Sequence, residues 1–335
     1  MLYGLIKPHR SVSTVGMCKN AGKTTVLNSL IADCAAAGET IGLTSIGRDG
    51  ERSDVVTGTK KPEIYIFDGT VIATAEEALP LGDVSREVLD TTGMPTPMGE
   101  VVIIRAKSDG FIQLAGPSMT AQLRVLKEKM LGFGAERVFI DGALSRKSLA
   151  MPAVSDAAIL STGASYSRDI AKTCADTAHA AALMLLPQTK IGDLTARQTA
   201  AKFTVLTDSD AFGCETAADA ADKIRSEKAK TLLIRGGVTD ANLEALFAAG
   251  RALSGLEAVC EDGSRLLVSE KNYAKFLRAG AGFTVLQSTK LLAVTVNPFS
   301  AYGAHYDKER FLEAVRRAIP EEVPVLDVKK EIPDA

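Results

Sequence analysis

The sequence Gly16-Met17-Cys18-Lys19-Asn20-Ala21-Gly22-Lys23-Thr24-Thr25 lies between a short β-branched run, 12–15, and a stretch with helical apolar spacing, 23–37. Gly38 ends that stretch, and an apolar run over 40–46 follows it. This order predicts a strand, a helix and a second strand. Such a unit at the start of a chain favours a parallel sheet with helices on its faces.

A glycine-containing turn from a strand into a helix is suited to binding phosphate. Backbone N–H groups of the turn and of the helix start point toward an anion there, and Gly22 lets the backbone come close to it. Lys23 is expected to reach the β- and γ-phosphates, and the Thr24 hydroxyl is expected to bind Mg²⁺. The residues expected to hold the nucleotide are Lys19, Asn20, Ala21, Gly22, Lys23, Thr24 and Thr25.

The turn matches the Walker A pattern with one departure. The strict pattern puts its first glycine at position 17, where this chain has Met17, and Gly16 stands one position early. A helix that merely begins with Gly-Lys-Thr is the alternative. Cys18 lies in the turn close to the helix start, which predicts a lowered thiol pKa. With no histidine near it in the sequence, Cys18 is not interpreted as catalytic.

Two aspartates follow predicted strands and can complete a magnesium site. Asp141 ends the apolar strand 137–141, and Asp49 follows the second strand. Together with Thr24 they offer the oxygen ligands that Mg²⁺ prefers, and Asp141 joins Lys23 as a candidate catalytic residue. Turn formation is the competing explanation for both aspartates.

We expect the whole chain to divide into three parts. Residues 1–190 are expected to form an α/β nucleotide-binding domain with an antiparallel excursion over 62–115. Within it, hairpins are predicted around Asp68-Gly69 and Asp109-Gly110. Residues 195–287 alternate between strand and helix patterns and form an insertion or sheet extension, and 288–335 return to complete the first domain. The fold class is therefore α/β, a mostly parallel sheet flanked by helices, with a β-hairpin insertion and a second α/β region.

Composition excludes several classes of protein. The formal net charge of −2 gives no bulk attraction to nucleic acid or to anionic lipid, and no apolar run approaches the ~20 residues of a membrane span. Five scattered cysteines and three histidines suggest neither a disulfide framework nor a zinc site. The apolar stretch at the start is too short for a signal peptide, so a reducing cytoplasm is the expected location.

The loop Cys18-Lys-Asn-Ala-Gly-Lys-Thr-Thr, the acid after the second strand and Asp141-Gly142-Ala143 together resemble the SIMIBI class of P-loop NTPases. Dethiobiotin synthetase and the molybdopterin-guanine dinucleotide accessory proteins are the subtypes it most resembles. The late strand 291–296 followed by Asn297, and Val323-Pro-Val-Leu326, are similar to the former. That resemblance implies Mg²⁺ held by Thr24, Asp49 and Asp141, and an adenine base read by Asn297. The first ~35 residues are also similar to reactivase-type subunits associated with lysine 5,6-aminomutase.

The expected function is that of a Mg²⁺-dependent nucleoside triphosphatase using ATP, an accessory or reactivation factor for a metabolic enzyme. A small-molecule kinase or ATP-dependent ligase similar to dethiobiotin synthetase is one alternative, and a nucleotide-sensing module without hydrolysis is another. The choice between ATP and GTP stays open, as do the protein partner and a homodimeric assembly.

Overall fold

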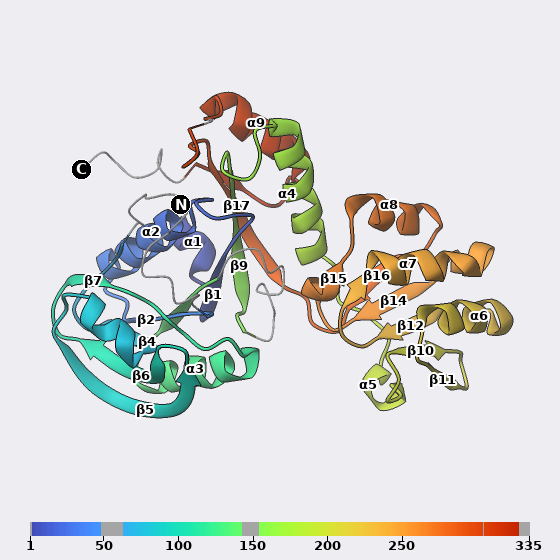
Figure 1. Ribbon diagram of the computed structural model, residues 1–335, viewed down its shortest axis with the longest axis horizontal. Coiled ribbons are helices and arrows are strands. Elements are labelled where there is room, and N and C mark those ends of the chain that lie inside the picture. The colour runs from blue at the N-terminus through green and yellow to red at the C-terminus, as the bar shows by residue number, and fades with distance from the viewer. Residues whose placement is uncertain (1, 48–62, 143–153, 304, 328–335) are drawn as a thin grey trace. The chain divides into compact units, whose positions relative to one another are not determined.

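The computed structural model describes residues 2–47, 63–142, 154–303 and 305–327. The chain divides into two compact units, one made of residues 1–181 and 290–335 and the other of residues 182–289. The predicted division placed the inserted part at 195–287, so the structure assigns a longer segment to it. The first unit is therefore discontinuous in sequence, with its last strands supplied from beyond residue 289 (Figure 1).

The described part of the first unit is built on a nine-stranded mixed sheet, in the order β18-β17-β9-β1-β8-β2-β4-β6-β5. Neighbours from β18 to β4 pair in parallel, and β6 and β5 add an antiparallel edge. The strands are β1 (Ser11–Gly16), β2 (Ile41–Ser45), β4 (Val71–Ala75), β5 (Arg86–Thr96), β6 (Gly99–Ala106), β8 (Arg137–Asp141), β9 (Ala157–Gly163), β17 (Lys290–Asn297) and β18 (Val325–Leu326).

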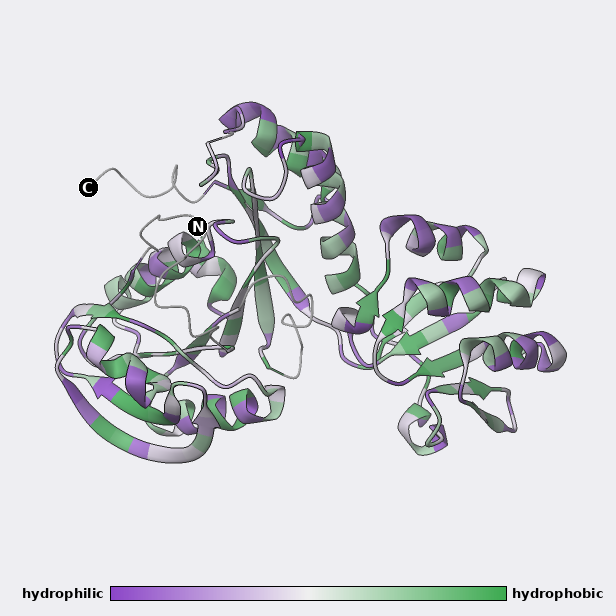
Figure 2. Ribbon diagram, viewed as in Figure 1, coloured by the Kyte–Doolittle hydropathy of each residue, from purple (hydrophilic) through white to green (hydrophobic). Residues whose placement is uncertain are grey.

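Helices pack on both faces of this sheet, which explains why its central strands read as continuous apolar runs. Figure 2 colours β9 and β17 largely hydrophobic. In β8, Phe139 joins the core beneath α1 and α2, while its neighbours Val138 and Ile140 join the core beneath α3. The helices of this unit are α1 (Leu2–Ile6), α2 (Lys23–Ala36), α3 (Thr120–Gly132), α9 (Lys308–Ala318) and most of α4 (Ile170–Met184), with a 3₁₀ turn, η1, over Glu76–Leu81.

Both predicted hairpins in 62–115 are wrong, although the turn at Asp68-Gly69 forms. Gly69 adopts a φ of 85°, and the chain turns there. The flanking strands then separate: β3 (Ile64–Ile66) pairs with β7 (Gly110–Ile112) in a small antiparallel sheet, while β4 lies in the main sheet between β2 and β6. Burial explains the separation, because all of β4 is buried whereas β3 alternates buried and exposed side chains. The antiparallel hairpin that does form joins β5 and β6.

The second unit contains a five-stranded sheet in the order β11-β10-β12-β14-β16. Its strands are β10 (Phe203–Leu206), β11 (Ala211–Cys214), β12 (Thr231–Ile234), β14 (Glu257–Cys260) and β16 (Gly282–Val285), and β13 (Val238–Thr239) pairs with β15 (Leu266–Leu267) apart from it. The helices are α5 (Leu194–Arg197), α6 (Ala217–Glu227), α7 (Asp240–Leu246) and α8 (Glu270–Arg278), with 3₁₀ turns η3 (Phe247–Leu253) and η4 (Gly263–Arg265). This unit has a core of its own.

Every helix within the described ranges is too short or too polar to cross a membrane.

Candidate functional site

The carboxyl ends of four parallel strands meet at one edge of the large sheet. The register pairs Gly16 of β1 with Ser161 of β9, and Thr14 of β1 with Asp141 at the end of β8. Asn297, the last residue of β17, lies beside Gly163, the last residue of β9. The loops that leave these strands therefore start from the same edge, which is where open α/β sheets bind their ligands.

The backbone of the loop after β1 includes two residues in the left-handed region. The Met17 N–H donates to the Ser161 carbonyl at 2.9 Å, so the chain still follows β9 at that residue. Left-handed φ values occur at Asn20 (59°) and Gly22 (101°), but not at Met17. Position 17 therefore does not need a glycine for a left-handed conformation. Successive N–H groups in such a turn form a concavity that accepts an anion.

Helix α2 begins at this loop, and its N-cap residue has no side chain that could cap it. Gly22 is the N-cap residue, and no side-chain hydrogen bond caps the helix. The Val26 N–H donates to the Gly22 carbonyl at 3.0 Å as the helix begins. The partial positive charge at the amino end of this helix would stabilise an anion placed there.

Lys23 folds back over the start of the loop. A Cβ built on Gly16 would lie 2.9 Å from Lys23 Cδ and 3.0 Å from Lys23 Nζ. A side chain at position 16 would occupy the path of the lysine, so the early glycine has a physical reason. The ammonium group is consequently held close to the loop that would receive the phosphates.

The pKa of the Cys18 thiol shows that the expected lowering at this position is wrong. Burial raises the pKa of Cys18 to about 11, and the charge of Lys23 offsets only part of that rise. The free energy cost of a buried thiolate outweighs the attraction of one neighbouring ammonium. Cys18 is thus a neutral thiol at physiological pH.

Asp141 ends β8, which lies in the sheet between β1, the strand before the loop, and β2. Thr14 Oγ1 donates to Asp141 Oδ1 at 3.3 Å, and the Gly142 N–H donates to the Thr14 carbonyl at 2.9 Å. A Cβ at Gly142 would lie 2.5 Å from that carbonyl oxygen, so glycine allows the chain to stay close to β1 after the aspartate. The Asp141 side chain is half-buried at the sheet edge from which the loop departs.

The expected magnesium ligands fall partly outside the described residues. Thr24 lies in the first turn of α2 and Asp141 at the end of β8, whereas Asp49 is outside the described ranges. Among described residues, no group of three or more histidine, cysteine, aspartate or glutamate side chains converges on one point. A hydroxyl and a carboxylate are nonetheless hard oxygen ligands, and Mg²⁺ on a nucleotide takes its other ligands from phosphate and water.

Asn297 contacts the loop directly. Its Nδ2 donates to the Asn20 carbonyl at 3.0 Å, and its Cβ would be 3.4 Å from a Cβ placed on Gly22. Its Oδ1 accepts the Phe299 N–H at 3.1 Å, and its main-chain carbonyl accepts the Ala164 N–H at 2.9 Å. The structure thus brings this residue, distant in sequence, to the candidate phosphate site, with both ends of its amide bonded to the main chain.

Sequence reasoning missed the contacts that tie the loops after β9 and β17 together. Ser165 Oγ accepts the Ala301 N–H at 3.2 Å, and the Tyr306 hydroxyl donates to the Ser167 carbonyl at 2.5 Å. Tyr306 also shares a hydrogen bond of 2.9 Å with Thr173 of α4. Serine and tyrosine in turns carry no sequence signal for such long-range pairing. Ser165 and Ser167, which precede α4, therefore hold the loop that follows Asn297.

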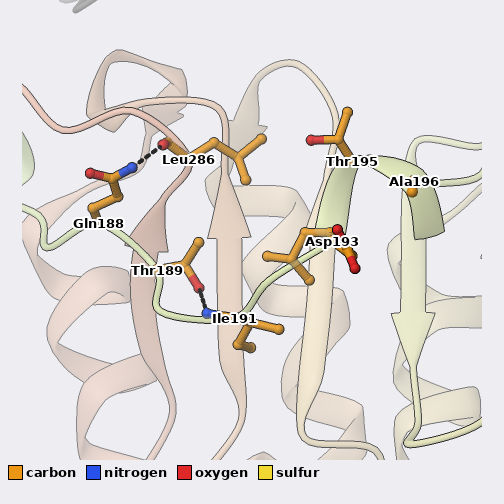
Figure 3. A pocket seen from close by; sticks show the side chains of 8 residues that line it. Gln188, Thr189, Ile191, Asp193, Thr195, Ala196 and Leu286 are labelled. Atoms are coloured by element: carbon orange, nitrogen blue, oxygen red, sulfur yellow. Dashed lines mark hydrogen bonds between the residues drawn. The ribbon is translucent and has the colours of Figure 1, made fainter.

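A pocket of about 610 Å³ lies in the second unit, and its lining includes none of the residues expected to bind nucleotide. Its wall includes Leu194. Figure 3 shows Ile191, Asp193 and Leu286, which also line it. Gln188 Nε2 donates to the Leu286 carbonyl at 3.1 Å, and the Ile191 N–H donates to Thr189 Oγ1 at 3.3 Å. Both hydrogen bonds join residues of the pocket wall to one another. The lining residues do not include a group of nucleophilic or acid–base side chains that could carry out a reaction.

Comparison with protein family models, with curated protein sequences and with solved structures finds no match to this chain.

Proposed function

We propose that this protein binds a Mg²⁺–nucleoside triphosphate at residues 16–25 and hydrolyses it. One observation carries the proposal: the Lys23 side chain lies folded over Gly16, beside a loop whose left-handed residues precede an uncapped helix. A fixed cation, a backbone concavity and a helix amino end at one place favour a polyphosphate.

The described residues suggest a separate role for each side chain in such a reaction. Lys23 would stabilise the charge on the β- and γ-phosphates, and the N–H groups of 18–24 would hold their oxygens. Thr24 and Asp141 would hold Mg²⁺, directly or through water, and the metal would neutralise charge as a water attacks in line. We propose ATP as the nucleotide on the strength of the resemblance to SIMIBI-class proteins.

Measurement of nucleotide binding and turnover tests this proposal. The full chain should bind ATP in the presence of Mg²⁺, and Lys23→Ala should weaken binding by roughly 10- to 100-fold through loss of a charged hydrogen bond. Lys271→Ala in α8 serves as the matched control, because it removes an exposed lysine from the other unit. Equal affinity in wild type and Lys23→Ala would exclude the site.

Turnover separates this proposal from its two alternatives. Hydrolysis without any added metabolite supports the triphosphatase, and acceleration by a partner enzyme supports an accessory role for it. Turnover that requires one metabolite indicates a kinase or ligase. Tight binding without turnover under any of these conditions indicates a nucleotide sensor.

A further inference from the structure

We infer that Asn297 is a positioning residue that holds the phosphate loop in its binding conformation, and that it does not select the base. The inference rests on the proposed function, because it assigns a role within that site. The resemblance to dethiobiotin synthetase implies the opposite role, recognition of adenine. The hydrogen bonds of the side chain favour the positioning role.

Recognition of adenine by asparagine uses both ends of the amide. The Oδ1 accepts from the exocyclic amine while Nδ2 donates to a ring nitrogen, so both groups must face the base together. In this structure Oδ1 accepts the Phe299 N–H and Nδ2 donates to the Asn20 carbonyl. Each end of the amide thus already serves the main chain, and only the second lone pair of Oδ1 and the second N–H of Nδ2 are left for a base.

The same contacts explain how the loop keeps an unfavourable conformation. Asn20 has a φ of 59°, a left-handed value that costs a residue other than glycine about 1–2 kcal/mol, less for asparagine. The bond from Asn297 fixes the carbonyl of that residue, and the Asn297 side chain also lies against Gly22. Asn297 thus restrains the two positions at which the loop backbone is left-handed.

Asn297 is itself rigidly placed. It ends a strand in the main sheet, its register partner is Gly163, and its carbonyl accepts the Ala164 N–H. A Cβ on Gly163 would lie 2.6 Å from that carbonyl, so glycine permits the close approach of the two strands. The loop is therefore hydrogen-bonded to the end of β17, which lies two strands away from β1 in the sheet.

Inorganic tripolyphosphate provides a decisive probe, because it fills a phosphate site and has no base. Binding of tripolyphosphate, ATP and GTP to the wild-type chain and to Asn297→Ala is measured by titration calorimetry with Mg²⁺ present. We expect Asn297→Ala to weaken all three ligands by a similar factor, roughly three- to tenfold for one lost hydrogen bond. Binding stoichiometry reports the folded fraction separately, so misfolding would lower stoichiometry without changing affinity.

Two further variants sharpen the result. Tyr302→Ala changes an exposed side chain of the same loop and should leave tripolyphosphate affinity unchanged. Asn297→Gln retains the donor, and part of the lost affinity should return. If Asn297→Ala weakens ATP while tripolyphosphate binds as in the wild type, Asn297 contacts the base and the inference is wrong. If the wild-type chain binds none of the three ligands, the proposed function itself fails.

Discussion

Lys23 and Gly16 are in direct contact across the loop, with the lysine side chain occupying the space that a Cβ at position 16 would need. The two residues stand at opposite ends of the motif, seven positions apart. Their contact explains why a glycine is found at 16 when the strict pattern asks for one at 17. It also fixes the ammonium group near the carboxyl end of β1 before any ligand binds.

Gly16→Ala should weaken triphosphate binding while leaving the fold intact. The new methyl group would lie about 3 Å from Lys23 Cδ, Cγ and Nζ, so the flexible lysine would have to move. Displacing its ammonium from the phosphate site should cost roughly tenfold or more in affinity. Gly4→Ala is the control, because a Cβ there meets no atom within 4 Å. Titration calorimetry measures the affinities, and an unchanged affinity in Gly16→Ala would show that Lys23 does not act from its observed position.

The core of the sheet could be predicted from the sequence because its signals are local. The run 12–15, the helix over 23–37 and the strand ending at Asp141 correspond to β1, α2 and β8. Each is a buried apolar stretch with a turn residue at its end. The late strand before Asn297 was predicted for the same reason, and it is β17.

The pairing of strands could not be predicted, because it depends on which faces other elements cover. The turn at Asp68-Gly69 suggested that β3 and β4 pair, yet β4 is buried on both faces and pairs with β2. The strand β14 begins with the charged residue Glu257, which weakens the apolar signal of this short strand. Glu257 accepts hydrogen bonds from Thr189 and Thr284, which is a tertiary reason for its place.

The roles of individual site residues were predictable only in part. The glycine-lysine-threonine sequence indicates a phosphate loop, but the hydrogen bonds of Asn297 depend on a strand nearly 300 residues from the loop. The pKa of the Cys18 thiol could not be predicted from the local sequence either. Its position near a helix start predicted a low pKa, whereas its burial, which no local pattern reveals, raises the pKa.

Asp141→Asn should lower turnover far more than it lowers nucleotide affinity. The amide retains the size of the carboxylate and can still accept from Thr14, so the end of β8 should keep its structure. It loses the negative charge that would help hold Mg²⁺ where charge develops on the transferred phosphoryl group. Steady-state turnover and calorimetric affinity are compared with the wild type over a range of Mg²⁺ concentrations. Equal losses in turnover and affinity would indicate a structural role for Asp141 instead.

Asn20→Gly and Asn20→Ala should separate the backbone and side-chain roles of Asn20. Its Nδ2 is buried and has no hydrogen-bond partner among the described residues, a state that a phosphate oxygen would relieve. Both variants lose that donor and should weaken triphosphate binding by roughly three- to tenfold. Glycine tolerates the φ of 59° and alanine does not, so the alanine variant should be the less stable by about 1 kcal/mol.

Thermal unfolding without ligand measures the backbone effect, and calorimetry measures the effect on binding. Wild-type affinity in Asn20→Gly would show that the side-chain amide does not contact phosphate. Equal unfolding midpoints for the two variants would show that the left-handed conformation at Asn20 is not retained in solution.

Alkylation of Cys18 should be slow at neutral pH and should rise steeply as the pH increases. The thiolate is the reactive form, and a pKa of about 11 leaves roughly one thiol in a thousand ionised at pH 8. The Lys23 charge lowers this pKa, so Lys23→Ala should raise it further and slow the reaction at a given pH. Bound triphosphate should also slow it, by adding negative charge and by covering the loop.

Iodoacetamide labelling, quantified by mass spectrometry of the peptide that contains Cys18, measures the rate between pH 7 and pH 10. A thiol with an ordinary pKa near 8.5 reaches half of its maximal rate at that pH, whereas Cys18 should still be gaining rate at pH 10. The unfolded chain in denaturant provides the reference, because burial no longer acts there. A rate that levels off below pH 8 in the folded protein would mean that the loop is open to water at Cys18, and that the helix start and Lys23 outweigh burial after all.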